Sequence, residues 1–164
     1  MPANDLRQFI DVLRKAGELA VVDTEVDPEL EVSEITDRVS KVHGPALLFN
    51  NPKGSRIPIL INQFGSMGRM SLALGGEDLN AIAGRIGQLT ELQMPQGIVA
   101  KVKALGKLKG LAAAAPKVVR SGLCQEVVMD EPDLDVLPIL KTWPGDGGPF
   151  ITLPVVFTRD PATG

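Results

Sequence analysis

The sequence predicts an α/β fold followed by the start of a β domain. Three segments with helical periodicity alternate with three short runs of strand-forming residues. In chain order these six segments are 5–16, 18–22, 28–43, 46–49, 57–61 and 78–92. A further β-type run covers 150–158, after a stretch rich in proline and glycine. We therefore expect a small sheet covered by helices, and then a second region built from strands.

The first helix is predicted over 5–16. Its apolar positions repeat with helical spacing: Leu6, Phe9, Ile10 and Leu13. Asn4 or Asp5 is placed to cap the start, and Gly17 occupies the position where glycine commonly ends a helix. This apolar stripe requires a sheet to cover.

The second helix is predicted to begin with Asp27 as N-cap and Pro28 in its first turn, and to end at Gly44. The segment 62–69 is expected to be a loop, because it contains two glycines and no helical periodicity. The third helix, over 78–92, is interrupted soon afterwards by Pro95.

A weaker helical segment over 97–118 is expected to bridge two domains. It carries basic residues with no acid among them: Lys101, Lys103, Lys107, Lys109, Lys117 and, just after it, Arg120. One hypothesis is a nucleic-acid stripe, which predicts salt-sensitive retention on heparin. Because no aromatic residues interleave with these bases and acidic residues follow, a solvated helix face is favoured.

The last third of the chain is predicted to be mainly extended. We expect a strand over 124–129, an acidic loop over 130–135 and an extended piece over 136–140. The pentapeptide 160–164, Asp-Pro-Ala-Thr-Gly, has the composition of a turn, which predicts a returning strand beyond it. The chain is therefore expected to be the front part of something longer.

Composition places the chain among globular proteins. Hydrophobic residues make up 44%, charged residues 23%, and the formal net charge is −3, so no polyanionic partner is indicated. The sequence contains one cysteine, and the N-terminus resembles no signal peptide, so a cytoplasmic location is expected.

Few residues are candidates for chemistry. His43 precedes a Gly-Pro pair at a helix end, where a capping or surface role is favoured over catalysis. Cys124 is expected to be a buried structural thiol rather than a nucleophile. One histidine and one cysteine cannot form a zinc-type cluster. The segment 145–148, Gly-Asp-Gly-Gly, precedes a strand and lacks the nucleotide-loop spacing, so it is either a tight turn or a close backbone approach to a flat ligand or to Trp143.

Several long motifs resemble, in order and spacing, the N-terminal part of the UbiD family of decarboxylases. They lie at 5–10, 17–19, 26–38, 44–54, 62–65, 124–126, 137–140 and 143–152. The last of these reads Trp-Pro-Gly-Asp-Gly-Gly-Pro-Phe-Ile-Thr. The segment from about 91 to 120 matches the family least.

The resemblance implies a non-oxidative decarboxylase of aromatic or α,β-unsaturated acids, such as 4-hydroxy-3-polyprenylbenzoate in ubiquinone or menaquinone biosynthesis. It also implies prenylated FMN, a divalent metal (Mn or Mg) and K in a split β-barrel, a homo-oligomer, and a flavin prenyltransferase that supplies the cofactor. The family's metal ligands and catalytic Glu-Arg-Glu set are expected downstream of Gly164. Only Thr152 and Pro154 correspond to neighbours of the cofactor, so this chain alone is expected to bind no cofactor and to be inactive.

These expectations divide the chain into an α/β domain over 1–95, a helical bridge over 96–118 and the first strands of an FMN-binding type split barrel over 119–164. The alternative hypothesis is a non-catalytic binding or assembly module built on the α/β domain. The two hypotheses differ in whether the reading frame continues past residue 164 into the strands that carry the family's catalytic residues.

Overall fold

The computed structural model describes residues 3–76, 78–90 and 118–164. These residues fall into two compact units, one formed by 1–78 together with 133–164 and the other by 79–132. The proposed bridge over 97–118 lies outside the described residues, apart from its last position.

The first unit contains a three-stranded mixed sheet in the order β1-β2-β3. The strands are β1 (Leu19–Val22), β2 (Ala46–Phe49) and β3 (Ile59–Ile61). β1 and β2 run parallel, with Leu19 opposite Ala46, and β2 and β3 run antiparallel. The parallel pair requires a crossover, which the helix α2 (Glu31–Lys41) supplies.

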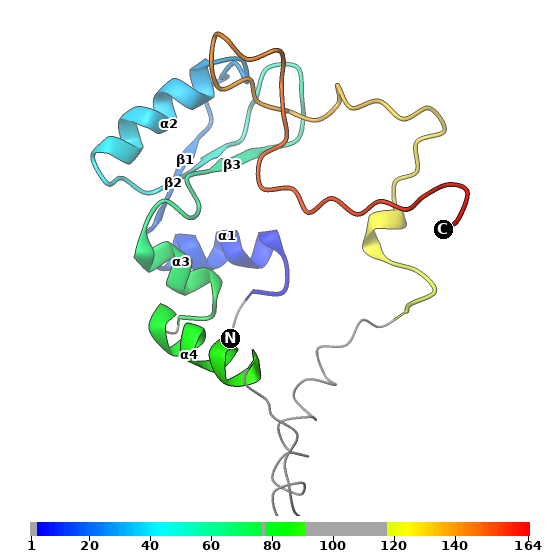
Figure 1. The fold of residues 1–164 in the computed structure, drawn as a ribbon. Helices are drawn as coiled ribbons and strands as arrows, with labels where there is room; N and C mark the ends of the chain where they lie inside the picture. The colour runs from blue at the N-terminus through cyan, green and yellow to red at the C-terminus, as the bar shows by residue number, and fades with distance from the viewer. Residues whose placement is uncertain (1–2, 77, 91–117) are drawn as a thin grey trace, which may run out of the picture. The chain divides into compact units, whose positions relative to one another are not determined.

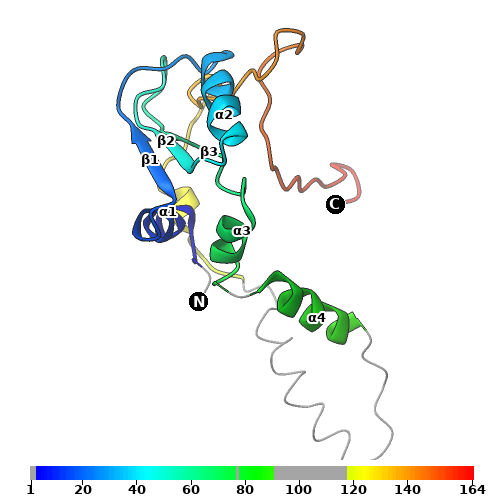
Figure 2. The same cartoon turned by 90° about the vertical axis from the view of Figure 1, so that its left-hand side faces the viewer.

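Helices cover both faces of this sheet. Figure 1 shows α2 above the strands and α1 (Leu6–Lys15) with α3 (Met67–Ala73) below them, and Figure 2 gives the same arrangement from the side. Neighbouring residues of β2 point to opposite faces, so Leu47 packs in the cluster under α2 whereas Ala46 packs with α1. All four residues of β2 are therefore buried, and the strand is a continuous apolar run.

Two apolar clusters hold these layers together. The cluster on the α2 side consists of Val26, Val32, Leu47, Phe49 and Ile59, with Ile35, Val39 and Leu140 packed against it. The cluster on the other side consists of Phe9, Leu13 and Ala46, with Leu72 and Ala73 of α3 packed against it. Leu140 thus brings the C-terminal segment into the core of the N-terminal domain.

The predicted first helix is confirmed to within one residue at each end. The Asp5 carboxylate accepts a hydrogen bond from the Gln8 amide at 2.8 Å, and Gly17 has φ +72° just beyond the helix. The predicted strands at 18–22 and 46–49 are also confirmed, and the one at 57–61 is shortened to 59–61.

The predicted start of the second helix is wrong. Asp27 does not cap it. The Asp27 carboxylate accepts from the Glu29 amide at 2.9 Å and so forms a local turn, after which Leu30 adopts φ +66° and the helix begins at Glu31. At the other end the helix stops at Lys41, before the predicted end at Gly44, and His43 adopts φ +55°.

The loop predicted over 62–69 is wrong in its last third, because α3 begins at Met67. Ser66 caps it by accepting from the Arg69 amide at 3.1 Å. The third predicted helix is confirmed as α4 (Leu79–Thr90), which belongs to the second unit, and the remainder of that prediction lies outside the described residues.

The strands predicted in the last third of the chain are absent from the described residues. A short 3₁₀ helix, η1 (Leu123–Gln125), stands where a strand was expected at 124–129, and the run 150–158 is irregular. The turn at 160–164 is confirmed, because the Asp160 carboxylate accepts from the amides of Ala162 and Thr163 at 2.7 and 2.9 Å. No helix in the described part of the chain is long and apolar enough to cross a bilayer.

Candidate functional site

The segment 136–150 carries the Trp-Pro-Gly-Asp motif and is attached to the N-terminal domain at several points. The Leu30 amide donates to the Lys141 carbonyl at 2.9 Å, and the Ser55 hydroxyl donates to the Val136 carbonyl at 2.9 Å. Between these two contacts, Leu140 packs on the core cluster under α2. The segment is thus held by backbone, hydroxyl and apolar contacts together.

An ion pair reinforces the attachment. The Lys141 ammonium lies 2.9 Å from the Glu29 carboxylate, and the two residues also form an isolated parallel bridge. The Lys141 side chain is only 24% exposed, whereas that of Glu29 is 62% exposed. Because the Lys141 side chain is partly shielded from water, its partner is more important than it would be on an open surface.

Beyond Lys141 the chain forms a loop that is closed on itself. The Phe150 amide donates to the Leu140 carbonyl at 3.0 Å. Inside the loop, the Asp146 carboxylate accepts from the Trp143 amide at 2.9 Å and from the Thr142 hydroxyl at 3.1 Å. Asp146 therefore fixes the loop through its side chain, a role that the sequence reasoning missed.

The tight-turn interpretation of 145–148 is supported by a backbone hydrogen bond, from the Asp146 amide to the Trp143 carbonyl at 3.1 Å. A side chain added at Gly145, Gly147 or Gly148 would meet no described atom within 4 Å, and none of the three has a positive φ. A close approach of these glycines to Trp143 is therefore not seen among the described residues, while a close approach to a flat ligand stays a prediction.

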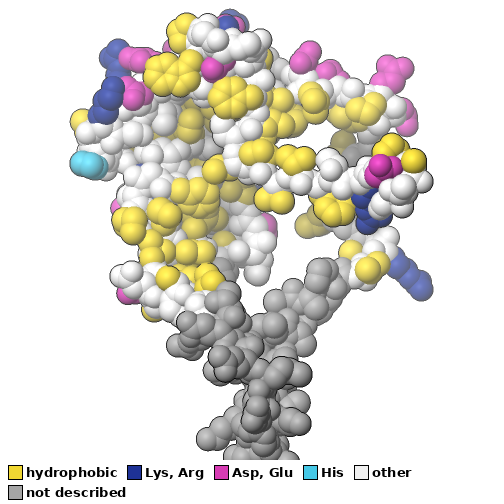
Figure 3. Space-filling model, viewed as in Figure 1, with side chains coloured by type: hydrophobic (Ala, Val, Ile, Leu, Met, Phe, Trp, Pro, Cys, Tyr) yellow, Lys and Arg dark blue, Asp and Glu magenta, His cyan; other side chains and the backbone are white. Residues whose placement is uncertain are grey.

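Thr152 and Pro154, the two predicted neighbours of a cofactor, lie just after this loop and are both exposed. Thr152 lines a hollow of about 290 Å³, while Pro154 lies outside its lining. The other residues of the lining are apolar: Ile57, Pro58, Ile59, Leu60, Leu137, Pro138, Ile139, Leu140, Phe150 and Ile151. Figure 3 shows that many apolar side chains are exposed on the face of the molecule seen in Figure 1.

This lining suits one side of a flat apolar ring, with a single hydroxyl for a hydrogen bond at its edge. It does not suit the phosphate of a flavin nucleotide, because it contains no cationic side chain. Across the described ranges, moreover, no three His, Cys, Asp or Glu side chains gather as a metal site. The described residues therefore fit only a part of the cofactor site that the family implies.

Trp143 lies on the other side of the same segment. Its side chain is 70% exposed and lines a hollow of about 610 Å³ together with residues of α2, among them Ser33 and Lys41. The Ser33 hydroxyl oxygen is buried and has no hydrogen-bond partner among the described residues. The indole therefore does not belong to the core of the domain.

A third hollow, of about 470 Å³, is bordered by two lysines that each pair with a carboxylate before α2. Lys53 lies 2.8 Å from Asp27, and Lys141 pairs with Glu29 as described above. The hydrogen bond from Lys53, followed by that from the Glu29 amide, lowers the pKa of Asp27 below its ordinary value. The same contact raises the pKa of Lys53.

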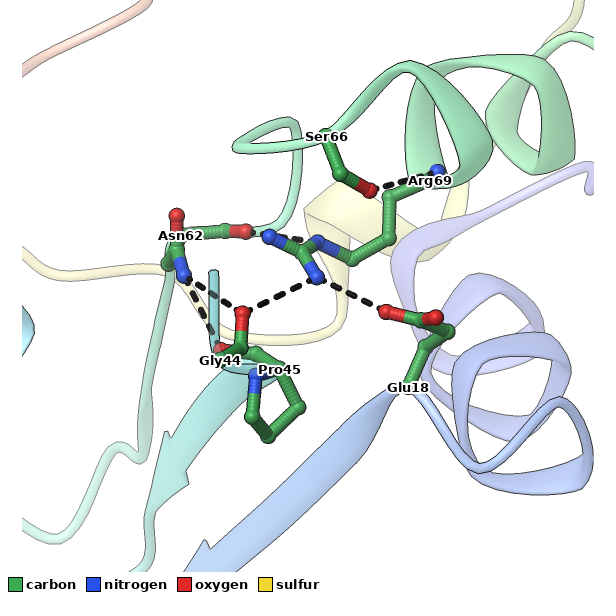
Figure 4. Close-up of polar contacts among 6 residues, drawn as sticks. All are labelled: Glu18, Gly44, Pro45, Asn62, Ser66 and Arg69. Atoms are coloured by element: carbon green, nitrogen blue, oxygen red, sulfur yellow. Dashed lines mark hydrogen bonds and ion pairs between the residues drawn. The ribbon is translucent and has the colours of Figure 1, made fainter. Parts of the chain in front are cut away.

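A buried arginine, also missed by the sequence reasoning, organises the opposite end of the sheet (Figure 4). Arg69 on α3 is 1% exposed, and its guanidinium donates to the Glu18 carboxylate at 2.7 Å. It also donates to the carbonyls of Gly44 and Asn62, each at 3.1 Å. All these acceptors belong to the fold, so Arg69 is a structural residue.

The turn before α3 is shaped around this arginine. Asn62 has φ +57°, and its amide group donates to the Pro45 carbonyl at 2.9 Å. A side chain on Gly65 would overlap the Asn62 side-chain oxygen and lie 2.9 Å from the Arg69 guanidinium. The motif 62–65 therefore needs asparagine and glycine for packing reasons.

The two other candidate residues have no catalytic surroundings. His43 is exposed at the end of α2, which agrees with the predicted surface role. Cys124 is also exposed, so its prediction as a buried thiol is wrong. The apolar residues that follow it, including Val127 and Val128, are exposed as well, because no strand forms there to bury them.

Comparison with known proteins identifies the class of protein. Residues 10–89 match the profile of the 3-octaprenyl-4-hydroxybenzoate carboxy-lyase N-terminal domain, UbiD_N. Residues 117–164 match the profile of the Rift-related domain of the same carboxy-lyases. The two matches follow each other in the order in which the resemblance predicted them.

Two curated relatives are uncharacterized proteins of Aquifex aeolicus (strain VF5) and Archaeoglobus fulgidus. Each is 47% identical to this chain. The alignment covers 98% of this chain for the first relative and 100% for the second. The matched region is 34% of each relative, so the chain spans about a third of their length.

Solved structures show the same fold. An evolved dimeric form of the UbiD-class enzyme HmfF from Pelotomaculum thermopropionicum, in complex with prFMN, matches with a TM-score of 0.63 and 23% identity, over 99% of this chain and 34% of that one. Vanillic acid decarboxylase from Sedimentibacter hydroxybenzoicus, in open form with truncated ShVdcD, matches with a TM-score of 0.65 and 25% identity, over 92% of this chain and 30% of that one. The chain belongs to the UbiD family.

Proposed function

We propose that residues 1–164 form the N-terminal part of a non-oxidative (de)carboxylase that acts on an aromatic or α,β-unsaturated carboxylic acid. The observation that carries this proposal is the pair of family matches, which occupy consecutive parts of the chain in the family's order. The relatives of similar fold include a vanillic acid decarboxylase, which supports an aromatic acid as the substrate class.

The proposed cofactor is prenylated FMN, held with a divalent metal (Mn or Mg) and K. Loss of CO₂ from an sp² carbon leaves charge without a resonance sink, and a flavin-derived cofactor supplies that sink when bound. The apolar hollow beside Thr152 supports a contact with the ring, and the HmfF relative was solved with prFMN. Thr152 and Pro154 remain our candidates for neighbours of the cofactor.

The surrounding architecture is part of the same proposal. Residues 1–95 would act as the α/β domain, 96–118 as a bridge and 119–164 as the first part of a split β-barrel of the FMN-binding type. The match of residues 117–164 to the Rift-related domain supports the last assignment. The evolved dimeric form of HmfF supports a homo-oligomer.

The substrate we favour is 4-hydroxy-3-polyprenylbenzoate or a similar acid of quinone biosynthesis, in a cell that also contains a flavin prenyltransferase. The description of both matching family profiles, a 3-octaprenyl-4-hydroxybenzoate carboxy-lyase, supports this choice. Because the family's metal ligands and catalytic Glu-Arg-Glu set are expected downstream of Gly164, we expect the polypeptide 1–164 alone to be inactive.

The test uses the complete gene product that carries this sequence, expressed together with a flavin prenyltransferase. We expect a bound flavin by absorption, and CO₂ release or ring-hydrogen exchange from at least one acid in a panel of vanillate, cinnamate and prenylated 4-hydroxybenzoates. The polypeptide 1–164 should retain no flavin through gel filtration. A complete gene product that neither binds flavin nor turns over any acid would favour the non-catalytic module instead.

A further inference from the structure

We propose that Glu29 and Leu30, in the turn before α2, are positioning residues for the loop that leads to Thr152. The inference rests on the proposed function, because it assigns the α/β domain a task in placing one wall of the cofactor site. The sequence does not indicate the contact between this turn and the loop, because Glu29 and Lys141 lie 112 positions apart.

The backbone at Leu30 is the first reason. A leucine at φ +66° and ψ −37° is strained, and such strain persists only where the surroundings enforce it. Here the conformation turns the Leu30 amide toward the Lys141 carbonyl, which it reaches at 2.9 Å. An ordinary helix start does not require a hydrogen bond to a segment so far along the chain.

The ion pair is the second reason. Lys141 is 24% exposed, and its ammonium reaches the Glu29 carboxylate at 2.9 Å, next to the backbone contact at Leu30. Both charged side chains lie at the base of the loop, next to Leu140, which packs on the core cluster. Replacing Lys141 by methionine therefore removes the ion pair and leaves Leu140 in place.

The third reason is how the contact is transmitted. The Leu140 carbonyl accepts from the Phe150 amide at 3.0 Å, so the end of the loop is fixed to its beginning, which is attached to the domain. Thr152 follows two residues later and lines the apolar hollow. Removing the Lys141 ammonium therefore loosens one of the contacts that hold the base of the loop, and with it the position of Thr152.

The first experiment measures amide hydrogen exchange by NMR in the chain 1–164. Lys141→Met should raise the exchange rates of the Leu30 and Phe150 amides about two- to five-fold, the factor that corresponds to a partly exposed ion pair. The Phe9 amide in α1 serves as the internal reference and should not change. The control is Lys53→Met, which removes a more exposed lysine whose partner, Asp27, lies in the same turn.

The second experiment measures binding of FMN, used as the probe, to the complete gene product by flavin fluorescence. Lys141→Met should weaken binding about two- to five-fold, Lys53→Met should not, and the charge reversal Glu29→Lys with Lys141→Glu should restore much of the affinity. Rescue by the reversed pair distinguishes positioning from a general loss of structure.

The outcomes separate the two proposals. If Lys141→Met leaves the exchange of Leu30 and Phe150 unchanged, or changes it without altering FMN affinity, the positioning role is wrong while the proposed function stands. If the unmodified protein binds no FMN, the proposed function fails at its cofactor, and the positioning of Thr152 toward a cofactor fails with it.

Discussion

Single residues decide how the connections of this domain are built, and Arg69 is the clearest case. A sequence pattern does not distinguish a buried arginine from an exposed one, because burial depends on the acceptors that the fold collects around it. Here the Glu18 carboxylate and two carbonyls come from three separate places in the chain. The motif resemblance included 17–19 and 62–65, but only the structure shows that both motifs supply acceptors to Arg69.

Arg69→Met should destabilise the domain by about 2 to 3 kcal/mol, because it leaves two carbonyls and a carboxylate without their charged donor. Urea denaturation followed by circular dichroism measures the change. The control is Arg38→Met, which removes an exposed pair with Glu34 and should stay within about 0.5 kcal/mol. Equal denaturation midpoints for the two variants would contradict the structural role of Arg69.

Gly65→Ala should also destabilise, by about 1 to 3 kcal/mol, because the new methyl group would overlap the Asn62 side chain. Gly68→Ala provides the matched control. Its added methyl group would have the Ser66 hydroxyl at 3.8 Å as its nearest neighbour, and alanine favours the helix α3. Thermal melts of the two variants should therefore move in opposite directions, and a shared direction would argue against the steric account.

The Asp27–Lys53 pair predicts a pH effect with a definite sign. Because the folded pKa of Asp27 is lowered, its stabilisation is present above the unfolded pKa of an aspartate and is lost as the pH falls through the folded value. The folded pKa of Lys53 is raised, so the stabilisation by its ammonium is present below the unfolded pKa of a lysine and is lost as the pH rises through the folded pKa. Lys53→Met should raise the titration midpoint of Asp27, measured by carboxyl NMR. An unchanged midpoint would show that the contact is not maintained in solution.

At the scale of secondary structure, periodicity predicted the elements whose own residues define them. The first helix has a capping aspartate, a four-residue apolar stripe and a final glycine, and each signal is local. Helix α3 was not predicted, because it has only seven residues and contains Gly68. Ser66 as a cap, followed by apolar residues at 67, 70 and 74, was the available signal.

The start of α2 shows a local signal that fails for a physical reason. Asp27 followed by Pro28 has the composition of a helix start, but a carboxylate can satisfy either a helix amide or a turn amide. Here the Asp27 carboxylate accepts from the turn amide of Glu29, and the contact with Lys141 then fixes Leu30 outside the helix. Long-range contacts of this kind cannot be derived from a single sequence.

Phe9 and Ile35 test the two faces of the sheet. Phe9→Ala should lower the free energy of unfolding by about 3 to 5 kcal/mol, because Phe9 is buried in the cluster on the α1 side of the sheet and stacks on Phe64. Ile35→Ala should cost less, about 2 kcal/mol, because Ile35 is only partly buried against its cluster. Chemical denaturation measures both against the exposed control Val42→Ala, and two midpoints equal to that of the control would show that the core is assigned wrongly.

At the scale of the whole molecule, the sequence predicted the family and the region of interest but not how that region is held. The motif 143–152 was recognised from its residues alone. Its attachment through Leu30, Glu29 and Ser55 was not, because each contact joins positions far apart in the chain. The predicted strand at 150–158 is absent from the structure because a strand requires a series of backbone partners, and among the described residues only the Phe150 amide has one, the Leu140 carbonyl.

The absence of partners leads to a prediction about exchange along the chain. No backbone amide in 151–159 donates to another backbone group among the described residues, and Val155, Val156 and Phe157 are exposed. In a dilute monomer of the chain 1–164, amides at 151–158 should exchange much faster than those of α1, which are protected by helix hydrogen bonds and by burial of Leu13.

Hydrogen exchange with mass spectrometry can compare the two regions in one sample. In the complete gene product, the same amides should become protected, because the match of 117–164 to the Rift-related domain predicts further strands that pair with this run. Protection at 151–158 equal to that of α1 in the chain 1–164 would show that these residues close their own sheet. Lack of protection in both proteins would show instead that the run is not a strand of the barrel.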